Sequence, residues 1–268
     1  MLLPTENSSE FDINYVLTET FVERVEYFES VPSTNTVALE KFCPTAEVKT
    51  PLLVLASQQT AGRGRGANQW WSVGGSLTFS LVIHPANWDI AESAWPKISL
   101  VSGLSVCLAL RNLALEEEDF KLKWPNDVHL NGRKVSGVLV EVGPRSSQTL
   151  VIGVGINVNN SFCDAPPELQ STATSMVDVA NESACLTDVL VQVLVWIEQI
   201  LNAFRRDEGC LATMWQQHCE LKGKRIEVES GNRIIAGHCQ GIDRDGALVL
   251  LTDAGTVRLF SGVVSRVD

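Results

Sequence analysis

The sequence predicts an α/β (α+β) protein in which a larger domain of strands and helices is followed by a small module made only of strands. Three observations carry this prediction. Short apolar runs of strand composition alternate with two long segments of helical periodicity up to about residue 220. An Asn-Gly pair at 131–132 separates two of the short runs, which is a strong signal for a β-hairpin turn. Beyond Gly223, strand candidates follow one another at close spacing, with glycines between them.

Composition and charge describe a folded protein with a buried core. Of the 268 residues, 45% are hydrophobic and 20% are charged, which is typical of globular domains. The net charge of −11 argues against a general nucleic-acid binder, because such proteins gain affinity by neutralising phosphates with lysine and arginine. The start of the chain lacks the pattern of a secretory signal. The longest apolar stretch, at 190–201, is interrupted by polar residues and is shorter than the roughly 20 residues of a membrane span.

The cysteines give a further indication of the compartment. Seven are scattered along the chain without any Cys-x-x-Cys pair, so neither a disulfide framework nor a zinc site is indicated. We therefore expect free thiols, no metal ion held by the protein itself, and a soluble cytoplasmic protein that binds neither membrane nor nucleic acid.

The first half of the chain predicts strands separated by a glycine-rich loop. The motif Ser33-Thr34-Asn35 precedes a short apolar-periodic stretch and is typical of a helix with an N-cap. Strands are expected at 52–56 and 77–83, and the segment 58–68 between them contains too many glycines for either helix or strand. Residues 95–115 carry apolar side chains at helical spacing and predict a core helix.

The second half continues with short strands and then helices. Strands are expected at 121–124, 128–130, 135–141 and 150–155. A long helix is expected over 187–204 with Thr187 as its N-cap, followed by a shorter helix over 211–219.

The last part of the chain predicts the separate strand module. Its strands are expected at 226–228, 234–242, 248–251 and 257–260. We place the domain boundary so that residues 1–220 form the larger domain and residues 221–268 form the module. A module of this size buries too little surface to be stable alone, so it is expected to dock on the larger domain.

The glycine-rich loop is the first candidate for chemistry. Gly62, Gly64 and Gly66 permit close approach of a ligand to the backbone, and Arg63 and Arg65 between them supply permanent charges suited to phosphate and carboxylate. The alternative is a mobile surface loop with solvated arginines. The loop has neither the Gly-Lys-Ser/Thr ending of a P-loop nor a Rossmann glycine pattern that opens a helix.

Two further motifs follow strand candidates. In Lys123-Trp124-Pro125-Asn126-Asp127, the proline ends the strand and fixes the lysine beside a turn, where its charge can stabilise an acyl or phosphoryl transfer. An exposed lysine before an ordinary turn is the alternative. In Gly153-Val154-Gly155-Ile156-Asn157, the glycines admit a ligand and the asparagine is suited to pairing with adenine, unless the segment is a β-bulge with a turn asparagine.

The order and spacing of these motifs decide between the readings. Ser-Thr-Asn is followed by Gln-x-x-Gly-Arg-Gly-Arg with a later Trp, by Lys-Trp-Pro-Asn-Asp, by Gly-Arg-Lys-x-x-Gly, by Gly-x-Gly-x-Asn, and finally by the strand module. Together they resemble the biotin protein ligase family, and the resemblance extends from about Val25 through the rest of the chain.

The resemblance implies a fold and a reaction. It implies a mixed sheet with flanking helices, similar to class II aminoacyl-tRNA synthetases, and a C-terminal SH3-like β barrel. It implies that biotin is activated with ATP and Mg²⁺ to biotinyl-5′-AMP. The biotinyl group then passes to a lysine of a biotin carboxyl carrier domain of a biotin-dependent carboxylase, and the enzyme is expected to be a monomer or a homodimer.

The resemblance also assigns roles to residues of this sequence. Catalysis is assigned to Lys123, Arg63 and Arg65. Contacts with biotin are assigned to Ser33, Thr34, Asn35, Gln59, Gly62, Arg63, Lys123, Trp124, Gly137 and Gly155. Contacts with ATP or the adenylate are assigned to Arg63, Arg65, Trp70, Lys123, Asn126, Lys134 and Asn157.

The sequence departs from many bacterial members of the family in its loop. Those members continue the loop with two further arginines, where this chain has Gly66 and Asn68. Trp70 is favoured over Trp71 for stacking on adenine because of its spacing. The segment before Val25 is too short for the DNA-binding domain of repressor members, so no such regulation is expected.

Two rival functions fit parts of the pattern. A lipoate–protein ligase or octanoyltransferase shares the fold but lacks Lys-Trp-Pro-Asn-Asp. A biotin-binding protein without catalytic activity is the other rival, and the presence of Lys123, Arg63 and Arg65 counts against it.

Overall fold

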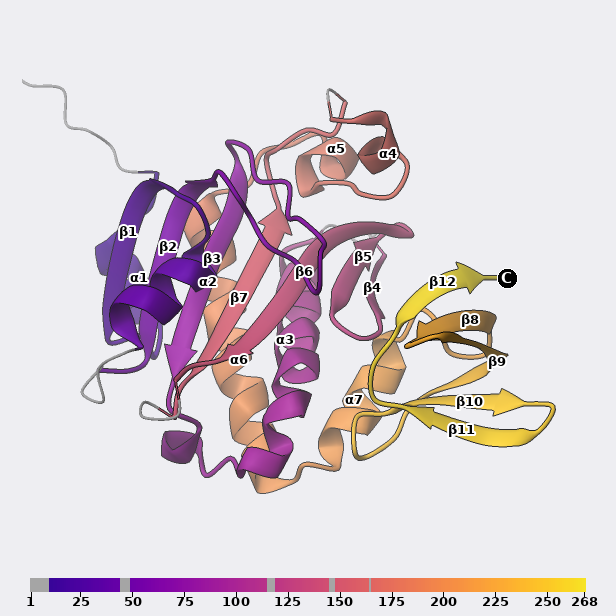
Figure 1. The fold of residues 1–268 in the computed structure, drawn as a ribbon. Helices are drawn as coiled ribbons and strands as arrows, with labels where there is room; N and C mark the ends of the chain where they lie inside the picture. Colours follow the sequence, from indigo (N-terminus) through magenta and orange to yellow (C-terminus); the bar gives the residue numbers. More distant parts are fainter. Residues whose placement is uncertain (1–9, 44–48, 115–118, 145–147, 164) are drawn as a thin grey trace, which may run out of the picture.

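The structure is a computed structural model that describes residues 10–43, 49–114, 119–144, 148–163 and 165–268. Its main element is a seven-stranded sheet in the order β1-β2-β3-β7-β6-β5-β4 (Figure 1). The strands are β1 Arg24–Val31, β2 Leu52–Gln59, β3 Ser76–Ile83, β4 Phe120–Lys123, β5 Asp127–Leu130, β6 Arg133–Val142 and β7 Leu150–Asn157. β1 and β2 are parallel and the other neighbours are antiparallel, so the sheet is mixed as predicted.

Both faces of the sheet are covered, which explains why every residue of the central strands β3 and β7 is buried. Leu53 and Leu55 of β2 belong to the large core beneath the helices. Leu52 and Val54 point to the opposite face, where they pack with the short helix α2 (Thr34–Val37) and the π-helical turn after it, Ala38–Phe42. Alternate side chains of one strand therefore supply two cores.

Two long helices form the main layer against the sheet. α3 (Ile98–Leu113) and α6 (Leu186–Arg206) run side by side across one face (Figure 1). The segments Glu92–Leu113 and Leu186–Arg206 are long and apolar enough to cross a membrane, but 67% and 56% of their most apolar windows are buried inside the protein. Their apolar surface is thus accounted for by packing in the core. The predicted end of the first helix at residue 115 lies outside the described residues.

The prediction for the start of α6 was wrong in its capping residue. Cys185 occupies the N-cap position and the helix begins at Leu186, so Thr187 lies within the first turn. The Thr187 hydroxyl instead accepts a hydrogen bond from the backbone N–H of Asp12, at 3.1 Å. Asp12 is the N-cap of α1 (Ile13–Glu19), so Thr187 ties α1 to α6.

The hairpin turn between β5 and β6 has the predicted conformation. Asn131 and Gly132 both have positive φ angles, of 50° and 79°. Two central residues of this kind define the type I′ turn, whose twist matches that of the flanking strands. The Asn-Gly prediction is confirmed.

Several elements were not predicted. They are β1, α1, the short helices α4 (Pro167–Gln170) and α5 (Met176–Ala180), and the last strand β12 (Val263–Val267). β1 is a sheet edge whose residues are mostly half-buried without regular alternation, and β12 alternates little, so neither carries a clear strand signal.

The C-terminal module is a five-stranded antiparallel sheet in the order β11-β10-β9-β8-β12. Its other strands are β8 Arg225–Ser230, β9 Arg233–Ile242, β10 Leu248–Thr252 and β11 Gly255–Leu259. Its apolar residues, such as Val228 and Leu250, belong to the same core cluster as Trp215 of α7 (Cys210–His218) and the residues of α3. The two sheets therefore share one continuous core.

Two thiols meet at the junction of the two sheets. Cys219 follows α7, and its backbone forms an isolated β-bridge with that of Leu122 in β4. Cys239 lies on β9. A hydrogen bond with the Cys239 thiol lowers the pKa of Cys219. By contrast, burial and the charge of Asp207 raise the pKa of Cys210, which is also partly exposed.

We predict that Cys219 is alkylated faster than Cys210 near neutral pH. The thiolate is the reactive form, and a lower pKa increases its population. The rates are measured by iodoacetamide labelling of the folded protein followed by peptide mass spectrometry, with Cys210 as the matched control. Faster labelling of Cys210 would contradict the prediction.

Candidate active site

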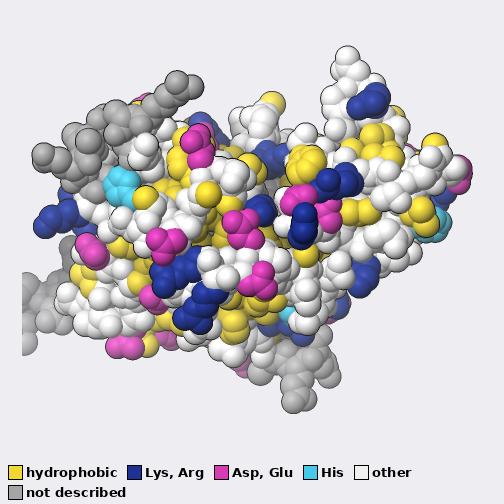
Figure 2. Space-filling view, turned by 90° about the horizontal axis from the view of Figure 1, so that it is seen from below, with side chains coloured by type: hydrophobic (Ala, Val, Ile, Leu, Met, Phe, Trp, Pro, Cys, Tyr) yellow, Lys and Arg dark blue, Asp and Glu magenta, His cyan; other side chains and the backbone are white. Residues whose placement is uncertain are grey.

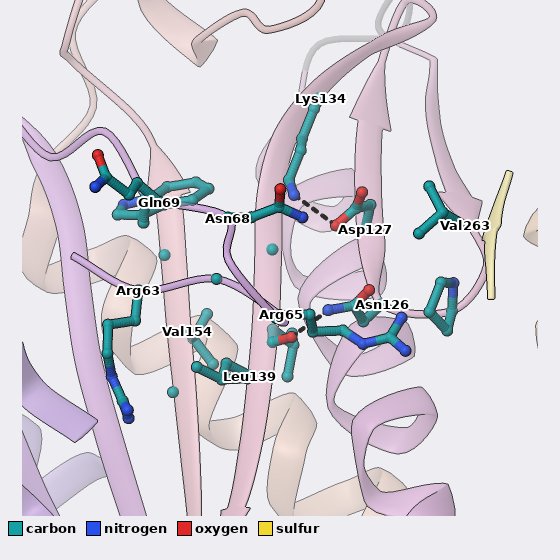
Figure 3. Close-up of a pocket in the computed structure, with 18 of the residues that line it drawn as sticks. Arg63, Arg65, Asn68, Gln69, Asn126, Asp127, Lys134, Leu139, Val154 and Val263 are labelled. Carbon is teal, nitrogen blue, oxygen red and sulfur yellow. Dashed lines mark hydrogen bonds and ion pairs between the residues drawn. The ribbon is translucent and has the colours of Figure 1, made fainter. Parts of the chain in front are cut away.

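A cavity of about 560 Å³ lies between the glycine-rich loop, strands β6 and β7, the 123–127 turn and the edge of the C-terminal sheet (Figure 3). Most residues singled out in the sequence line it: Ser33, Thr34, Asn35, Gln59, Arg63, Arg65, Trp70, Lys123, Trp124, Asn126, Lys134, Gly137 and Gly155. Gly62 lines an adjacent hollow behind the loop, and Asn157 lines neither.

The glycine-rich loop folds back on itself as a small hairpin. The Trp70 N–H donates to the Gly62 carbonyl at 2.9 Å, and the Gly64 N–H donates to the Asn68 carbonyl at 2.8 Å. These bonds bring Trp70 to the cavity. Trp71 packs instead against Phe162, with ring centroids 5.1 Å apart. Of the two adjacent tryptophans, the structure thus presents Trp70 to the cavity.

The indole of Trp70 rests on the backbone of β7. A side chain at Gly155 would clash with the ring, which explains the glycine at this position. The Lys134 ammonium lies 6.0 Å from the centroid of the same ring and 2.7 Å from the Asp127 carboxylate. Trp70 therefore has a glycine beneath it and a cation beside it.

The polar end of the cavity is built by α2 and β2. Gln59 Oε1 accepts the backbone N–H of Thr34 at 2.8 Å and the Thr34 hydroxyl at 3.2 Å. Ser33 occupies the N-cap position, but its side chain makes no capping hydrogen bond. The prediction of a helix capped by its own motif is therefore wrong in detail, because Gln59 supplies the cap from β2 and leaves Ser33 at the cavity.

Asn35 is buried, and its amide is used within the protein. Its Oδ1 accepts a hydrogen bond from Ser80 Oγ at 2.5 Å. Its Nδ2 donates to the Leu139 carbonyl at 3.2 Å and to Glu141 Oε2 at 2.8 Å. A side chain at Gly153 would clash with this amide. Asn35 thus connects α2 to β3 and β6 across the floor of the site.

Ser80 and Glu141 were missed by the sequence reading. Ser80 is fully buried, and its hydroxyl oxygen also lies 2.8 Å from the Thr34 hydroxyl oxygen. Glu141 pairs with Arg63. A serine inside the apolar run 77–83 and a glutamate closing 135–141 were the available signals, because buried polar groups require partners.

Lys123 ends β4, is half-buried and lines the cavity. Within the described part of the chain it takes part in no ion pair. Burial alone would raise the pKa of the nearby Glu220 carboxyl, but the hydrogen bond and charge of His129, together with the charges of Lys224 and Lys123, lower it. Lys123 is therefore a cation facing the cavity without a close carboxylate of its own.

The turn after Lys123 is anchored to β6. The Asn126 side chain donates to the Val138 carbonyl, and the Val138 N–H donates to the Asn126 carbonyl at 3.1 Å (Figure 3). Trp124 is buried and precedes a cis peptide bond to Pro125. Asn126 thus fixes the position of the turn as well as lining the cavity.

The structure does not bring Asn157 to the cavity. It is buried at the end of β7, where its Nδ2 donates to the Thr174 carbonyl at 3.1 Å. Its Oδ1 accepts from Asn160 Nδ2, also at 3.1 Å. Both ends of the amide are satisfied by neighbouring segments.

The C-terminal module completes the cavity wall, a contribution that the sequence reading did not anticipate. The lining residues from this module are Glu229, Gly231, Gly262, Val263 and Val264. They come from β8, β12 and the turns beside them.

The charges at the cavity run against the charge of the whole chain. Among the described residues, the lining cations Arg63, Arg65, Lys123 and Lys134 outnumber the lining carboxylates Asp127 and Glu229. Elsewhere, acidic and basic side chains are interspersed over the face shown in Figure 2. In a chain of net charge −11, this concentration of cations indicates a site for an anion such as a nucleotide.

Comparison with known proteins gives the class of protein and then the family. The model of the Biotin/lipoate A/B protein ligase family matches residues 27–157, and that of the Biotin protein ligase C terminal domain matches residues 222–267. A biotin--[acetyl-CoA-carboxylase] ligase of Mycobacterium tuberculosis is 31% identical over 235 residues, covering 87% of this chain and 85% of the relative. The bifunctional ligase/repressor BirA of Bacillus subtilis is 31% identical over 258 residues, covering 94% and 77%.

Solved structures agree with the sequence relatives. The biotin protein ligase of Aquifex aeolicus in complex with biotin and ATP superposes with a TM-score of 0.79 at 30% identity, covering 92% of this chain and all of that chain. This chain belongs to the biotin protein ligase family.

We predict that Ser80→Ala destabilises the protein whereas Ser136→Ala does not. Both serines are fully buried in the large sheet. Ser80 serves Thr34 and Asn35, so its loss should lower the free energy of unfolding by about 1–3 kcal/mol. Ser136 Oγ has no hydrogen-bond partner among the described residues, so its removal should be neutral or stabilising. Urea unfolding measures both changes, and equal effects would refute the distinction.

Proposed function

We propose that this chain activates biotin with ATP to form biotinyl-5′-AMP and then transfers the biotinyl group to a lysine of a biotin carboxyl carrier domain. The gathering of Arg63, Arg65, Lys123 and Trp70 around one cavity supports this best. The bound biotin and ATP of the Aquifex aeolicus ligase lend further support.

Biotin would occupy the part of the cavity next to α2. Ser33, Thr34 and Gln59 offer hydroxyl and amide groups suited to the polar ureido ring. The backbone at Gly137 and Gly155 and the indole of Trp124 would contact the rest of the molecule, whereas Gly62 lines only the adjacent hollow. Asn35 would act indirectly, since its amide already serves Ser80, Leu139 and Glu141.

The first step is formation of an acyl phosphate. A carboxylate oxygen of biotin attacks the α-phosphorus of ATP, the bond to the β-phosphate oxygen breaks, and pyrophosphate leaves. Negative charge builds up on the phosphoryl oxygens, and fixed cations lower the energy of such a transition state. Lys123 and Arg63 would stabilise this charge, and Arg65 would hold the adenylate afterwards.

The nucleotide would lie against the loop side of the cavity. Trp70 offers an aromatic surface for adenine, and a stacked base typically gains about 1–3 kcal/mol. Lys134 would contact the triphosphate, and Asn126 would face the adenylate. Asn157 takes no part in the proposal, because both ends of its amide are bonded within the protein.

ATP would enter as its Mg²⁺ complex. Mg²⁺ is commonly held by one or two carboxylates together with substrate phosphates. Asp127 and Glu229 are the carboxylates that line the cavity among the described residues. Among those same residues, no group of three or more His, Cys, Asp or Glu is placed to hold a metal ion.

In the second step, the lysine amine of the acceptor attacks the acyl carbon and AMP departs. Residues 1–220 would carry this chemistry, and residues 221–268 would close the cavity from one side.

All seven cysteines are free thiols, which supports a cytoplasmic location.

Biotin-dependent exchange of labelled pyrophosphate into ATP tests the proposal. Exchange should occur with biotin and Mg²⁺, and intact-mass measurement should show one biotinyl group added to a carboxyl carrier domain. Exchange with lipoate in place of biotin would assign the site to lipoate ligation. Absence of exchange with both acids would leave only a binding protein.

We predict that Lys123→Ala lowers the rate of adenylate formation about a hundredfold or more. The loss of one charge contact in the transition state commonly costs about 3 kcal/mol. Lys121→Ala is the matched control, because Lys121 lies on the same strand but pairs with Asp119, 3.2 Å away. Single-turnover formation of the adenylate is the measurement. Similar rates in the two variants would remove Lys123 from its role.

We predict that Arg65→Gly releases the activated intermediate. Without the guanidinium, biotinyl-5′-AMP should diffuse away and label lysines of bystander proteins. Mass spectrometry of a mixture of acceptor and bystander protein measures this. Arg244→Gly is the control, since Arg244 is 87% exposed. Strict labelling of the acceptor lysine by Arg65→Gly would contradict the prediction.

A further inference from the structure

Arg63 is paired with a carboxylate of the protein itself. Its guanidinium donates to Glu141 Oε2 at the end of β6. Figure 3 shows the Arg63 side chain pointing away from Lys134 and Asn126. Glu141 does not line the main cavity, but it lines the adjacent hollow behind the glycine-rich loop, together with Gly62 and Leu139.

The same carboxylate oxygen has a second donor. Glu141 Oε2 also accepts from Asn35 Nδ2 at 2.8 Å. Asn35 accepts a hydrogen bond from Ser80. The Ser80 hydroxyl contacts the Thr34 hydroxyl, which donates a hydrogen bond to Gln59 Oε1. Glu141 is thus held in place by the hydrogen-bond chain that forms the polar end of the cavity.

We propose that Glu141 is a specificity-determining residue that competes with the substrate carboxylate for Arg63. The inference rests on the proposed function, in which Arg63 binds the carboxylate of biotin and the phosphate. An anionic ligand compensates for the loss of the Glu141 contact, because its own negative charge then lies beside Arg63. A neutral ligand of the same shape cannot do so and leaves Arg63 on Glu141.

Electrostatics determines that this competition lowers the affinity for anionic ligands only. While Arg63 is held by Glu141, the ligand-binding arrangement is only partly populated, and the apparent affinity falls by that fraction. The side chain of Arg63 is 42% exposed and that of Glu141 is 26% exposed, so the pair is screened and exchangeable. Removing the charge of Glu141 should therefore strengthen anion binding and leave neutral ligands unaffected.

The reaction benefits from such a discrimination. Biotin enters as a carboxylate and leaves as a neutral amide on the acceptor lysine. Competition by Glu141 weakens binding of every ligand that needs Arg63, and an amide gains nothing from Arg63. The product side chain is thereby left without the contact that holds the substrate.

Glu141→Gln tests the proposal, because glutamine keeps the shape and an acceptor for Asn35 but loses the charge. Calorimetry of the full chain with biotin and with neutral biotinamide gives the two affinities. We expect biotin to bind about three- to tenfold more tightly than to the wild type, with biotinamide unchanged. The gain should shrink as salt concentration rises.

Glu26→Gln is the matched control, since Glu26 forms an Arg–Glu pair with Arg24 on β1, at 2.5 Å and similarly exposed. It should leave both affinities unchanged. Equal changes for biotin and biotinamide in Glu141→Gln would indicate a purely structural role, and weaker biotin binding would show that Glu141 assists Arg63. Either result overturns the inference. Failure of the wild type to bind biotin would instead overturn the proposed function.

A second measurement works on the wild type alone. The Nε–Hε resonance of Arg63 in a nitrogen-15 NMR spectrum, identified by its loss in Arg63→Lys, reports the partner of the guanidinium. Biotin should shift this resonance, and biotinamide should not. An equal shift with both ligands would overturn the proposal even if Glu141→Gln failed to fold.

Discussion

The cavity depends on the absence of side chains at two alternate positions of one central strand. Gly153 and Gly155 of β7 lie on the same face, two residues apart. The first admits the amide of Asn35, and the second admits the indole of Trp70. A methyl group at either position would displace a side chain from a buried, hydrogen-bonded or tightly packed place. The polar end and the aromatic wall of the site therefore both depend on these two glycine positions of β7.

Positive charge is concentrated around this strand, although the chain as a whole has a net charge of −11. The glycine-rich hairpin carries Arg63 and Arg65, β4 ends in Lys123, and β6 begins near Lys134. These four cations come from three separate segments of the chain, and the folded sheet brings the segments to one cavity. Glu141 pairs with Arg63, and Asp127 pairs with Lys134. The site is an arrangement of separated charges that a polyanion can bridge.

Features that depend on neighbouring residues could be predicted from the sequence, whereas contacts between segments far apart in the chain could not. The Asn-Gly turn, the long core helices and the strands around the site follow from short patterns of residues. The grouping of Arg63, Lys123 and Trp70 was implied by the resemblance to the biotin protein ligase family, which rests on the order of the motifs. The role of Thr187, the burial of Asn157 and the partner of Arg63 could not be predicted, because each depends on a contact between segments far apart in the chain. Glu141 is 78 residues from Arg63 and 106 from Asn35.

That separation has a consequence for how the protein acquires its binding site. Contacts between residues distant in the sequence form only after long loops have closed, and they slow folding relative to local contacts. The hydrogen-bond chain from Gln59 to Glu141 needs β2, β3 and β6 in register, so it forms only when the sheet is essentially complete. Partly folded chains therefore have no competent site. Any ligand of the cavity acts on the native state alone and stabilises it by mass action.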